Sequence, residues 1–305
     1  MSDSERPATF RLVLAWAAVY LIWGSTYLGI RLAIESIPPF LMAGSRHLLA
    51  GLLLYGWSRL GQRAPRPDAR DWIGAGGLGV LMLVTANGAT TWAEQLVPSG
   101  LTALIVCTSA LWLVVLNWLW RGADRPGGRM VAGLAAGFGG VALLVAPGRF
   151  AGSEHVNPIG ALVLTGAALS WSAGSIYALK LGRPQHPTRF VSMQMIVAGL
   201  VLVSASVLTG ESRGFTPANV SGTSMAAYLY LALFGSLISY SAYFWLLRHT
   251  TPGRLATISY VNPLVAVLLG WALAGEELTV RTALAAGVIL LAVGLITTPQ
   301  ARAQG

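Results

Sequence analysis

Ten apolar runs of about 20 residues each follow one another along nearly the whole chain, separated by short polar connections. A helix of about 20 residues crosses the roughly 30 Å of hydrocarbon in a bilayer, so each run has the length of one span. The chain is therefore predicted to be an all-α polytopic membrane protein with ten transmembrane helices. The expected spans are 12–33, 39–57, 72–93, 100–120, 130–146, 158–179, 190–209, 225–247, 255–274 and 282–297.

Composition agrees with this prediction and excludes several other classes of protein. Only 10% of the residues are Asp, Glu, Lys or Arg, whereas a soluble domain carries about 25%. The single cysteine, Cys107, excludes an intramolecular disulfide. The net charge of +9 is spread between the apolar runs and forms no basic block, so no nucleic-acid partner is expected.

The distribution of basic residues predicts the orientation of the spans. Short cytoplasmic loops retain Lys and Arg. One set of alternate connections, with the two termini, holds 15 of the 20 basic residues; the other set holds four, and Arg46 lies inside the second run. Both termini are therefore predicted to be cytoplasmic, which requires the even number of spans that the apolar runs give.

The sequence also contains an internal repeat. An offset of 148 residues pairs Trp23 with Trp171, and an offset of 154 pairs Pro98 with Pro252. Each repeat has five spans, an odd number, so the second copy must enter the membrane from the opposite side. Inverted repeats are typical of secondary transporters, in which two halves exchange conformations around a shared site. The two expected five-helix repeats are residues 1–149 and 150–305.

Four short motifs occur in order along the chain. They are LIWGSTY at 21–27, AGSRHLLAG at 43–51, WAEQLVPSGL at 92–101, and SYVNP at 259–263 followed by GEEL at 275–278. In order and spacing they resemble the EamA family, the ten-helix branch of the drug/metabolite transporter superfamily. The resemblance implies a bacterial inner-membrane exporter of amino acids or related metabolites. One departure is that family halves often end their fourth helix with Gly-Glu, as at Gly275 and Glu276, whereas the first half has Arg121 and Gly122.

The first span carries four aromatic residues at spacings of 4, 3 and 4, namely Trp16, Tyr20, Trp23 and Tyr27. This spacing predicts that they share one helical face. Rings near the end of a span also act as interfacial anchors, which is the simpler interpretation of Trp16. Trp23 and Tyr27 lie deeper, and together with Trp171 they are candidates for the wall of a cavity that suits an apolar or aromatic side chain.

Arg46 is the one basic residue predicted well within a span. A buried guanidinium is costly unless it faces water or a partner, so Arg46 is a candidate for binding a substrate carboxylate. The alternatives are snorkelling to the interface or pairing with Glu35 or Glu94. Gln194 is its counterpart 148 residues later and offers neutral polar groups. His47 is expected to point elsewhere and to pack as a hydrogen-bonded residue, but it is also the candidate for proton coupling, because histidine titrates near neutral pH.

A proline in the ninth span is expected to free a backbone carbonyl. Pro263 cannot donate to the carbonyl of Ser259, and Tyr260 and Asn262 belong to the same segment. Kinked polar segments often line a cavity, so Tyr260 and Asn262 are candidate substrate contacts. Weaker candidates, for which a hydrogen bond between helices is the alternative, are Asn87, Tyr240 and Tyr243.

Other kinds of chemistry find little support in the sequence. The GxGxxG pattern at 74–79 has no strand-turn-helix context, so tight helix packing explains it better than a dinucleotide site. The chain shows no cluster of metal ligands, no phosphate-binding loop and no catalytic constellation within the spans. No metal, cofactor, ATPase subunit or enzymatic activity is therefore expected, and the partners expected are a small-molecule substrate and the lipid bilayer.

The favoured hypothesis is an inner-membrane secondary transporter that exports amino acids, aromatic ones included, or related small metabolites by alternating access. One alternative is a proton-coupled exporter of drugs or cationic compounds, which needs a carboxylate within the membrane; a membrane-embedded enzyme is another. All eleven acidic residues are predicted to lie in termini, loops or span ends. This distribution favours facilitated diffusion over obligatory proton exchange.

Overall fold

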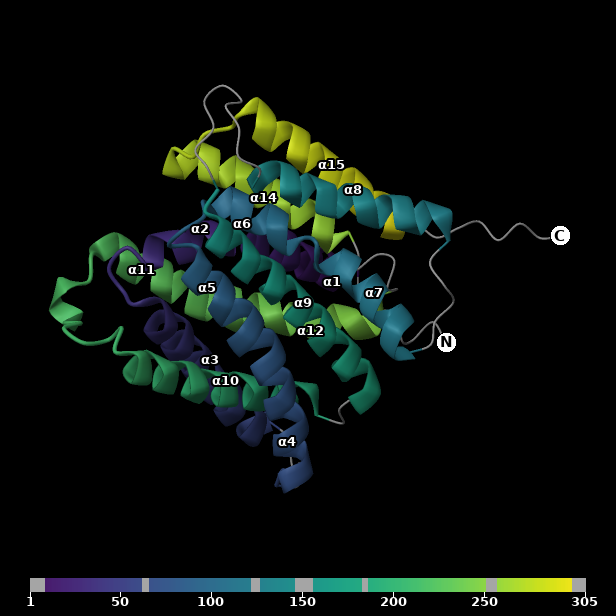
Figure 1. Cartoon of the computed structure of the whole chain (residues 1–305). Helices are drawn as coiled ribbons and strands as arrows, with labels where there is room; N and C mark the ends of the chain where they lie inside the picture. The colour runs from purple at the N-terminus through teal and green to yellow at the C-terminus, as the bar shows by residue number, and fades with distance from the viewer. Residues whose placement is uncertain are drawn as a thin grey trace.

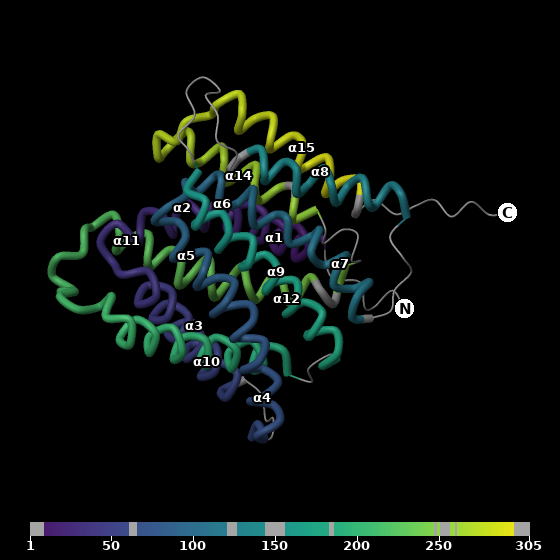
Figure 2. The backbone as a smooth tube through the Cα atoms, in the orientation of Figure 1, coloured from purple at the N-terminus to yellow at the C-terminus, as the bar shows by residue number. Residues whose placement is uncertain are grey.

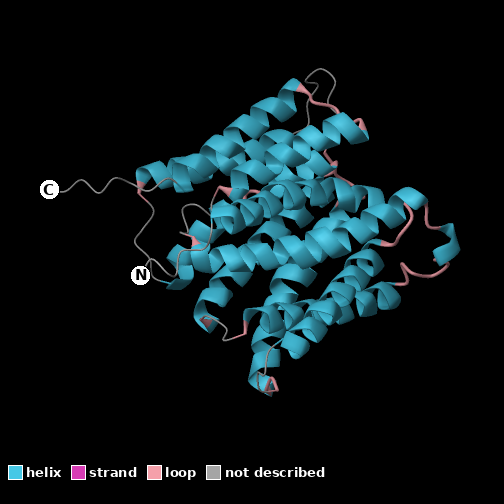
Figure 3. Ribbon diagram, turned by 180° about the vertical axis from the view of Figure 1, so that it is seen from behind, coloured by secondary structure: helices cyan, strands magenta, loops and turns pink. Residues whose placement is uncertain are grey.

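The computed structural model describes residues 9–61, 66–121, 127–145, 156–182, 186–250 and 257–297. Within these ranges the chain forms ten helical rods joined by short connections, and Figure 3 shows helices without any strand among them. The rods of the first half are built from α1 (Thr9–Ala17), η2 (Ala18–Ile22), α2 (Trp23–Ala33); α3 (Pro39–Gly61); α4 (Ala69–Leu78), η3 (Gly79–Gly88), α5 (Ala89–Ala93); α6 (Ser99–Val106), α7 (Ser109–Arg121); and α8 (Gly128–Val145). Those of the second half are built from α9 (Pro158–Leu181); α10 (Pro187–Thr209); α11 (Gly222–Tyr230), η5 (Leu231–Ser239), α12 (Tyr240–His249); α14 (Ile258–Ala274); and α15 (Val280–Thr297).

The rods have the length and composition of membrane spans. Six of them are long and apolar enough to cross a bilayer, and three more contain shorter apolar helices. The remaining rod, α3, is 23 residues long and carries the polar Arg46 and His47. Each predicted span corresponds to one rod, with ends that differ by a few residues. The protein is an all-α polytopic membrane protein, as the apolar runs predict.

The two halves of the chain pack against each other in matching pairs. α3 lies against α10 and α8 lies against α15, as can be followed in Figures 1 and 2. Between these pairs, α9 packs on η3 and α7, while α2 packs on α11 and α14. The first rod of each half therefore contacts the third and fourth rods of the other half.

Small residues allow some of these rods to approach closely. A Cβ atom built on Gly199 of α10 would lie 2.6 Å from the backbone nitrogen of Leu48, and one built on Gly51 of α3 would lie 2.9 Å from that of Ile196. A Cβ atom on Gly79 would lie 2.5 Å from the carbonyl oxygen of Gln194. Backbone contact of this kind is the usual role of glycine between membrane helices. The glycine-rich 74–79 segment thus serves helix packing, as predicted.

Local sequence signals explain several helix ends. Asp68 accepts a hydrogen bond from the backbone nitrogen of Asp71 at 2.8 Å, and the Asp71 carboxylate accepts one from the backbone nitrogen of Asp68 at 3.1 Å. This capping box starts α4. Gly210 ends α10 in the left-handed conformation, with φ of 76°, which glycine adopts without steric cost.

Three rods contain a π-helical segment within the described residues: η2, η3 and η5. η3 and η5 belong to the third rods of the two halves. π-Helical turns occur frequently at functional sites, because they displace side chains from the regular helical pattern. Side chains on η3 and η5 are therefore candidates for the functional site.

Candidate functional site

Four aromatic side chains from α2, α9 and α12 meet in an aromatic cluster, defined here as Trp23, Trp171, Tyr240 and Tyr243. The ring of Trp23 lies 5.7 Å from that of Trp171, 5.1 Å from that of Tyr243 and 6.4 Å from that of Tyr240, measured between centroids. The rings meet in tilted and edge-to-face arrangements, which aromatic pairs favour. Trp23 and Trp171, the pair related by the offset of 148 residues, are thus in direct contact.

The other aromatic residues of the first rod, Trp16, Tyr20 and Tyr27, lie outside the aromatic cluster. Trp16 lies 5.0 Å from Tyr20 and packs against the group of residues that includes Leu246 of α12. The Tyr20 hydroxyl is hydrogen-bonded to the Thr257 hydroxyl at 2.6 Å. Tyr27 makes no ring contact with the aromatic cluster among the described residues, and interacts electrostatically with Glu94 instead.

Gln194 joins α10 to the aromatic cluster. The Tyr240 hydroxyl donates a hydrogen bond to Gln194 Oε1 at 2.8 Å, and the Gln194 side chain is fully buried. Its Nε2 atom has no hydrogen-bond partner within the described part of the chain. The structure therefore brings together two predicted site residues and leaves one of their donors unused.

Arg46 is buried on α3, where only 2% of its surface is exposed. Its Nη2 atom donates to Asn87 Oδ1 at 2.6 Å and its Nη1 atom to Ser236 Oγ at 3.4 Å. Asn87 lies on η3 and Ser236 on η5, so the π-helical segments of both halves hold the guanidinium. Arg46 is therefore enclosed by the protein and forms no ion pair with Glu35 or Glu94, and its partner Asn87 is one of the weaker candidates from the sequence.

His47 does not point away from Arg46, and that prediction was wrong. Its Nε2 atom lies 3.1 Å from Asn87 Oδ1, the oxygen that also accepts from Arg46. Neighbouring side chains diverge on an isolated helix, but a polar group from an adjacent rod reaches the space between them. His47 is 3% exposed, and its Nδ1 atom has no hydrogen-bond partner in the described ranges.

The proline of the ninth rod acts differently from the prediction. α14 continues through Pro263 without interruption, and the freed carbonyl oxygen of Ser259 accepts a hydrogen bond from Cys107 Sγ at 2.9 Å. The carbonyl is therefore not available to a ligand, because a thiol from the fourth rod occupies it. Asn262 is 9% exposed, and its Oδ1 atom lacks a partner among the described residues. The Tyr260 side chain lies outside what the structure describes.

Glu94 is a buried polar residue that the sequence analysis assigned to a span end. It follows α5 directly, yet its side chain is fully buried. The Arg31 guanidinium donates to the backbone oxygen of Glu94 at 2.8 Å, while neither carboxylate oxygen has a hydrogen-bond partner within the described ranges. Glu94 thus lies at a span end, as predicted, but its side chain is enclosed by the packed rods.

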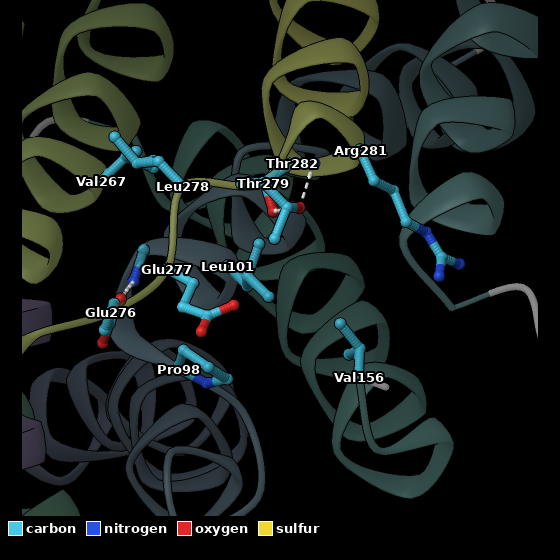
Figure 4. A pocket seen from close by; sticks show the side chains of 11 residues that line it. Pro98, Leu101, Val156, Val267, Glu276, Glu277, Leu278, Thr279, Arg281 and Thr282 are labelled. Carbon is cyan, nitrogen blue, oxygen red and sulfur yellow. Dashed lines mark hydrogen bonds between the residues drawn. The ribbon is translucent and has the colours of Figure 1, made fainter. Parts of the chain in front are cut away.

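Glu276 connects the second half of the chain to the first. Its Oε1 atom accepts from the backbone nitrogen and the hydroxyl of Ser99, at 2.6 and 2.7 Å, and its Oε2 atom accepts from the backbone nitrogen of Gly100 at 2.9 Å. It thereby caps the N-terminus of α6. Figure 4 shows Glu276 beside a pocket at the connection from α14 to α15. None of the residues that line this pocket is a predicted site residue.

The candidate site residues thus include a buried charge, several unused polar atoms and an aromatic cluster. Such groups suit the binding of a small molecule with a charged end and an apolar end. Among the described residues, no group of three or more His, Cys, Asp or Glu is placed to hold a metal ion.

Comparison with known proteins gives consistent results. The EamA-like transporter family matches residues 11–146 and 158–298. The chain is 40% identical to the uncharacterized inner membrane transporter YedA of Escherichia coli K12, over 92% of this chain and 88% of that protein. It is 31% identical to the protein PecM of Dickeya dadantii, over 82% and 80%. It is 24% identical to an Escherichia coli K12 protein named "Probable amino-acid metabolite efflux pump", over 91% of each. A solved crystal structure has the same fold, with a TM-score of 0.64 and 18% identity over 95% of this chain and 98% of its own.

Proposed function

The chain belongs to the EamA-like transporter family and is a membrane transporter, and from this premise we propose that it exports amino acids, aromatic ones included, or related small metabolites. In this proposal it is a secondary transporter. Two inverted five-helix repeats, residues 1–149 and 150–305, exchange conformations around the site between them by alternating access.

The observation that carries the proposal is the buried guanidinium of Arg46. It forms no ion pair with any described carboxylate, and its Nε atom has no hydrogen-bond partner in those ranges. A buried charge without a counter-charge is costly, so a carboxylate that binds there would be strongly favoured. The aromatic cluster supplies an apolar surface for the remaining part of such a substrate. An amino acid with an aromatic or aliphatic side chain has both features.

The names of two relatives support the cellular location and the direction of transport. One relative is named an inner membrane transporter, and another is named an amino-acid metabolite efflux pump. We propose the inner membrane for this chain as well, with both termini in the cytoplasm, because most basic residues lie on that set of connections.

A cationic-compound exporter is the second candidate, and the burial of Glu94 is the observation in its favour. A buried carboxylate is the group that such transport needs. The positive charge of Arg46 acts against it, since Arg46 and Glu94 interact electrostatically and a ligand with only a positive charge would be repelled by the guanidinium.

Counterflow in proteoliposomes that contain the full chain tests the function. Vesicles preloaded with unlabelled tryptophan should take up labelled tryptophan, and vesicles without protein should not. A lipophilic cation such as tetraphenylphosphonium should not compete with the uptake. Exchange of the cation without exchange of any amino acid would overturn the proposal in favour of the second candidate.

Reporter fusions test the orientation. Fusions after Gly127 and Gly182 should report the cytoplasm, and fusions after Gln95 and Gly210 should report the periplasm. The physical reason is the retention of basic connections on the cytoplasmic side. A reversed or mixed pattern would contradict the inverted arrangement of the two repeats.

A further inference from the structure

Glu94 is a fully buried carboxylate for which the surrounding protein supplies no hydrogen bond. Its side chain is 0% exposed, and neither oxygen has a partner among the described residues. A carboxylate that loses water without gaining hydrogen bonds is destabilised by several kcal/mol. This arrangement persists in a fold only where another benefit offsets the cost.

Arg46 presents the complementary situation on the neighbouring rod. α3, which carries Arg46, packs against α5, which Glu94 follows. The two groups influence each other electrostatically, yet their nitrogen and oxygen atoms do not approach within the 4.0 Å of an ion pair. Each keeps unused hydrogen-bonding atoms, Nε of Arg46 and both carboxylate oxygens of Glu94. A buried guanidinium and a buried carboxyl thus lie on neighbouring rods without forming an ion pair.

The other charged groups around Glu94 are engaged elsewhere. Arg31 on α2 donates to the backbone oxygen of Glu94, which fixes the end of the rod and leaves the carboxylate unbound. Glu276 caps α6. His47 on α3 shares an Asn87 oxygen with Arg46, and Tyr27 on α2 contributes an uncharged hydroxyl.

The protonation state of Glu94 follows from its position. It lies one residue beyond the apolar span Ala69–Ala93, and burial raises the pKa of its carboxyl well above the usual range. The nearby Glu276 adds to this rise, while Arg31 and Arg46 oppose it. Burial therefore favours the protonated form of the Glu94 carboxyl in the empty site.

We propose that Glu94 binds the ammonium group of the substrate while Arg46 binds its carboxylate, so that the site selects zwitterionic amino acids. The inference rests on the proposed function and names the substrate class. When the ammonium binds, the carboxyl O–H bond of Glu94 breaks, the proton leaves to solvent, and the carboxylate accepts hydrogen bonds from the ammonium, which keeps its own charge. One proton is therefore released for each substrate bound.

Binding to the purified full chain, measured by isothermal titration calorimetry, tests this assignment with three probes of the same shape. Phenylalanine carries both charged groups, phenethylamine lacks the carboxylate, and 3-phenylpropionate lacks the ammonium. The parent protein should bind phenylalanine about 10- to 100-fold more tightly than either analogue, as expected for charge-assisted hydrogen bonds. Glu94→Gln should weaken phenylalanine binding by the same factor and leave 3-phenylpropionate binding unchanged.

Three controls keep the result interpretable. Glu35→Gln removes an exposed carboxylate and should bind all three probes like the parent. Glu94→Asp retains the charge and should recover part of the affinity. Titration of the parent with phenylalanine at pH 7 in buffers of different ionisation enthalpy should show close to one proton released per ligand, a result that does not depend on whether the Gln variant folds.

The failures of the two proposals can be distinguished. If Glu94→Gln binds phenylalanine like the parent, or the parent releases no proton, the ammonium is bound elsewhere and this inference is wrong, while amino-acid transport stands. If the parent binds phenethylamine more tightly than phenylalanine and Glu94→Gln abolishes that binding, Glu94 is an ammonium site but the selection of zwitterions and the proposed function both fail.

Discussion

Arg46 and Gln194 occupy equivalent places on α3 and α10, two helices that pack against each other, yet their surroundings differ in kind. Arg46 carries a charge held by polar groups on η3 and η5, whereas Gln194 is a neutral amide that accepts a hydrogen bond from Tyr240. Both side chains are buried. The same position thus carries a charge in the first half and contacts the aromatic cluster in the second. A substrate with one charged end and one apolar end matches this difference.

The largest effect is expected from a change that disrupts the scaffold common to both residues. Gly199→Ala places a Cβ atom 2.6 Å from the backbone nitrogen of Leu48, which cannot move without shifting α3. We expect the free energy of unfolding to fall by about 1–3 kcal/mol, the usual cost of overpacking, with a lower thermal midpoint in detergent. Gly56→Ala is the control, because nothing lies within 4 Å of its added Cβ. Equal midpoints for the two variants would show that the close contact of α3 and α10 is unimportant.

The next effect concerns the charged side of the comparison. Arg46→Gln makes the first half resemble the second and removes the group proposed to bind a carboxylate, so amino-acid counterflow should fall by about 10- to 100-fold. Arg46→Lys should lose less, because it keeps the charge without the planar fork.

Arg213→Gln, which removes an exposed arginine, is the matched control for the Arg46 variants. Rates are compared at equal protein abundance. Transport at the parent rate in both Arg46 variants would assign that residue a purely structural role.

A smaller effect is expected on the aromatic side. Tyr240→Phe keeps the ring but leaves Gln194 Oε1 buried without its donor, which corresponds to about 1 kcal/mol and a loss of about fivefold in substrate affinity. Tyr243→Phe is the control, since the Tyr243 hydroxyl makes no hydrogen bond to a described residue while its ring also contacts Trp23. Binding can be followed by tryptophan fluorescence. Identical affinities in the two variants would show that the hydrogen bond between Tyr240 and Gln194 does not contribute to substrate binding.

The smallest effect is expected at His47. Gln at this position can still donate to Asn87 Oδ1, so His47→Gln should change the counterflow rate by less than about threefold at pH 6 and at pH 8. If the counterflow rate of the parent depends on pH and that of this variant does not, His47, and not Glu94, is the titrating group of the transporter.

The spans could be predicted because apolar length is a local property of the sequence. The contact between Trp23 and Trp171 also agrees with a pattern in the sequence, the offset of 148 residues. The burial of Glu94 could not be predicted in this way. It depends on which rods cover the end of α5, among them α3 and α9, and hydropathy at one position does not contain that information.

The interaction between Cys107 and Ser259 shows where local rules stop. The rule that proline frees the carbonyl four residues earlier identified Ser259 correctly. The partner of that carbonyl comes from 152 residues away, where the break between α6 and α7 brings a thiol against α14. Asn87 is a similar case, because its contacts with both Arg46 and His47 depend on how η3 packs against α3.

The cap that Glu276 places on α6 limits whether one half of the chain could replace the other. The position 154 residues before Glu276 is Gly122, which has no side chain to accept a hydrogen bond. A protein assembled from two copies of the first half would leave the backbone N–H groups of Ser99 and Gly100 without the carboxylate that they now share. The two halves are therefore not interchangeable at this contact, because the second half supplies the carboxylate that caps a helix of the first.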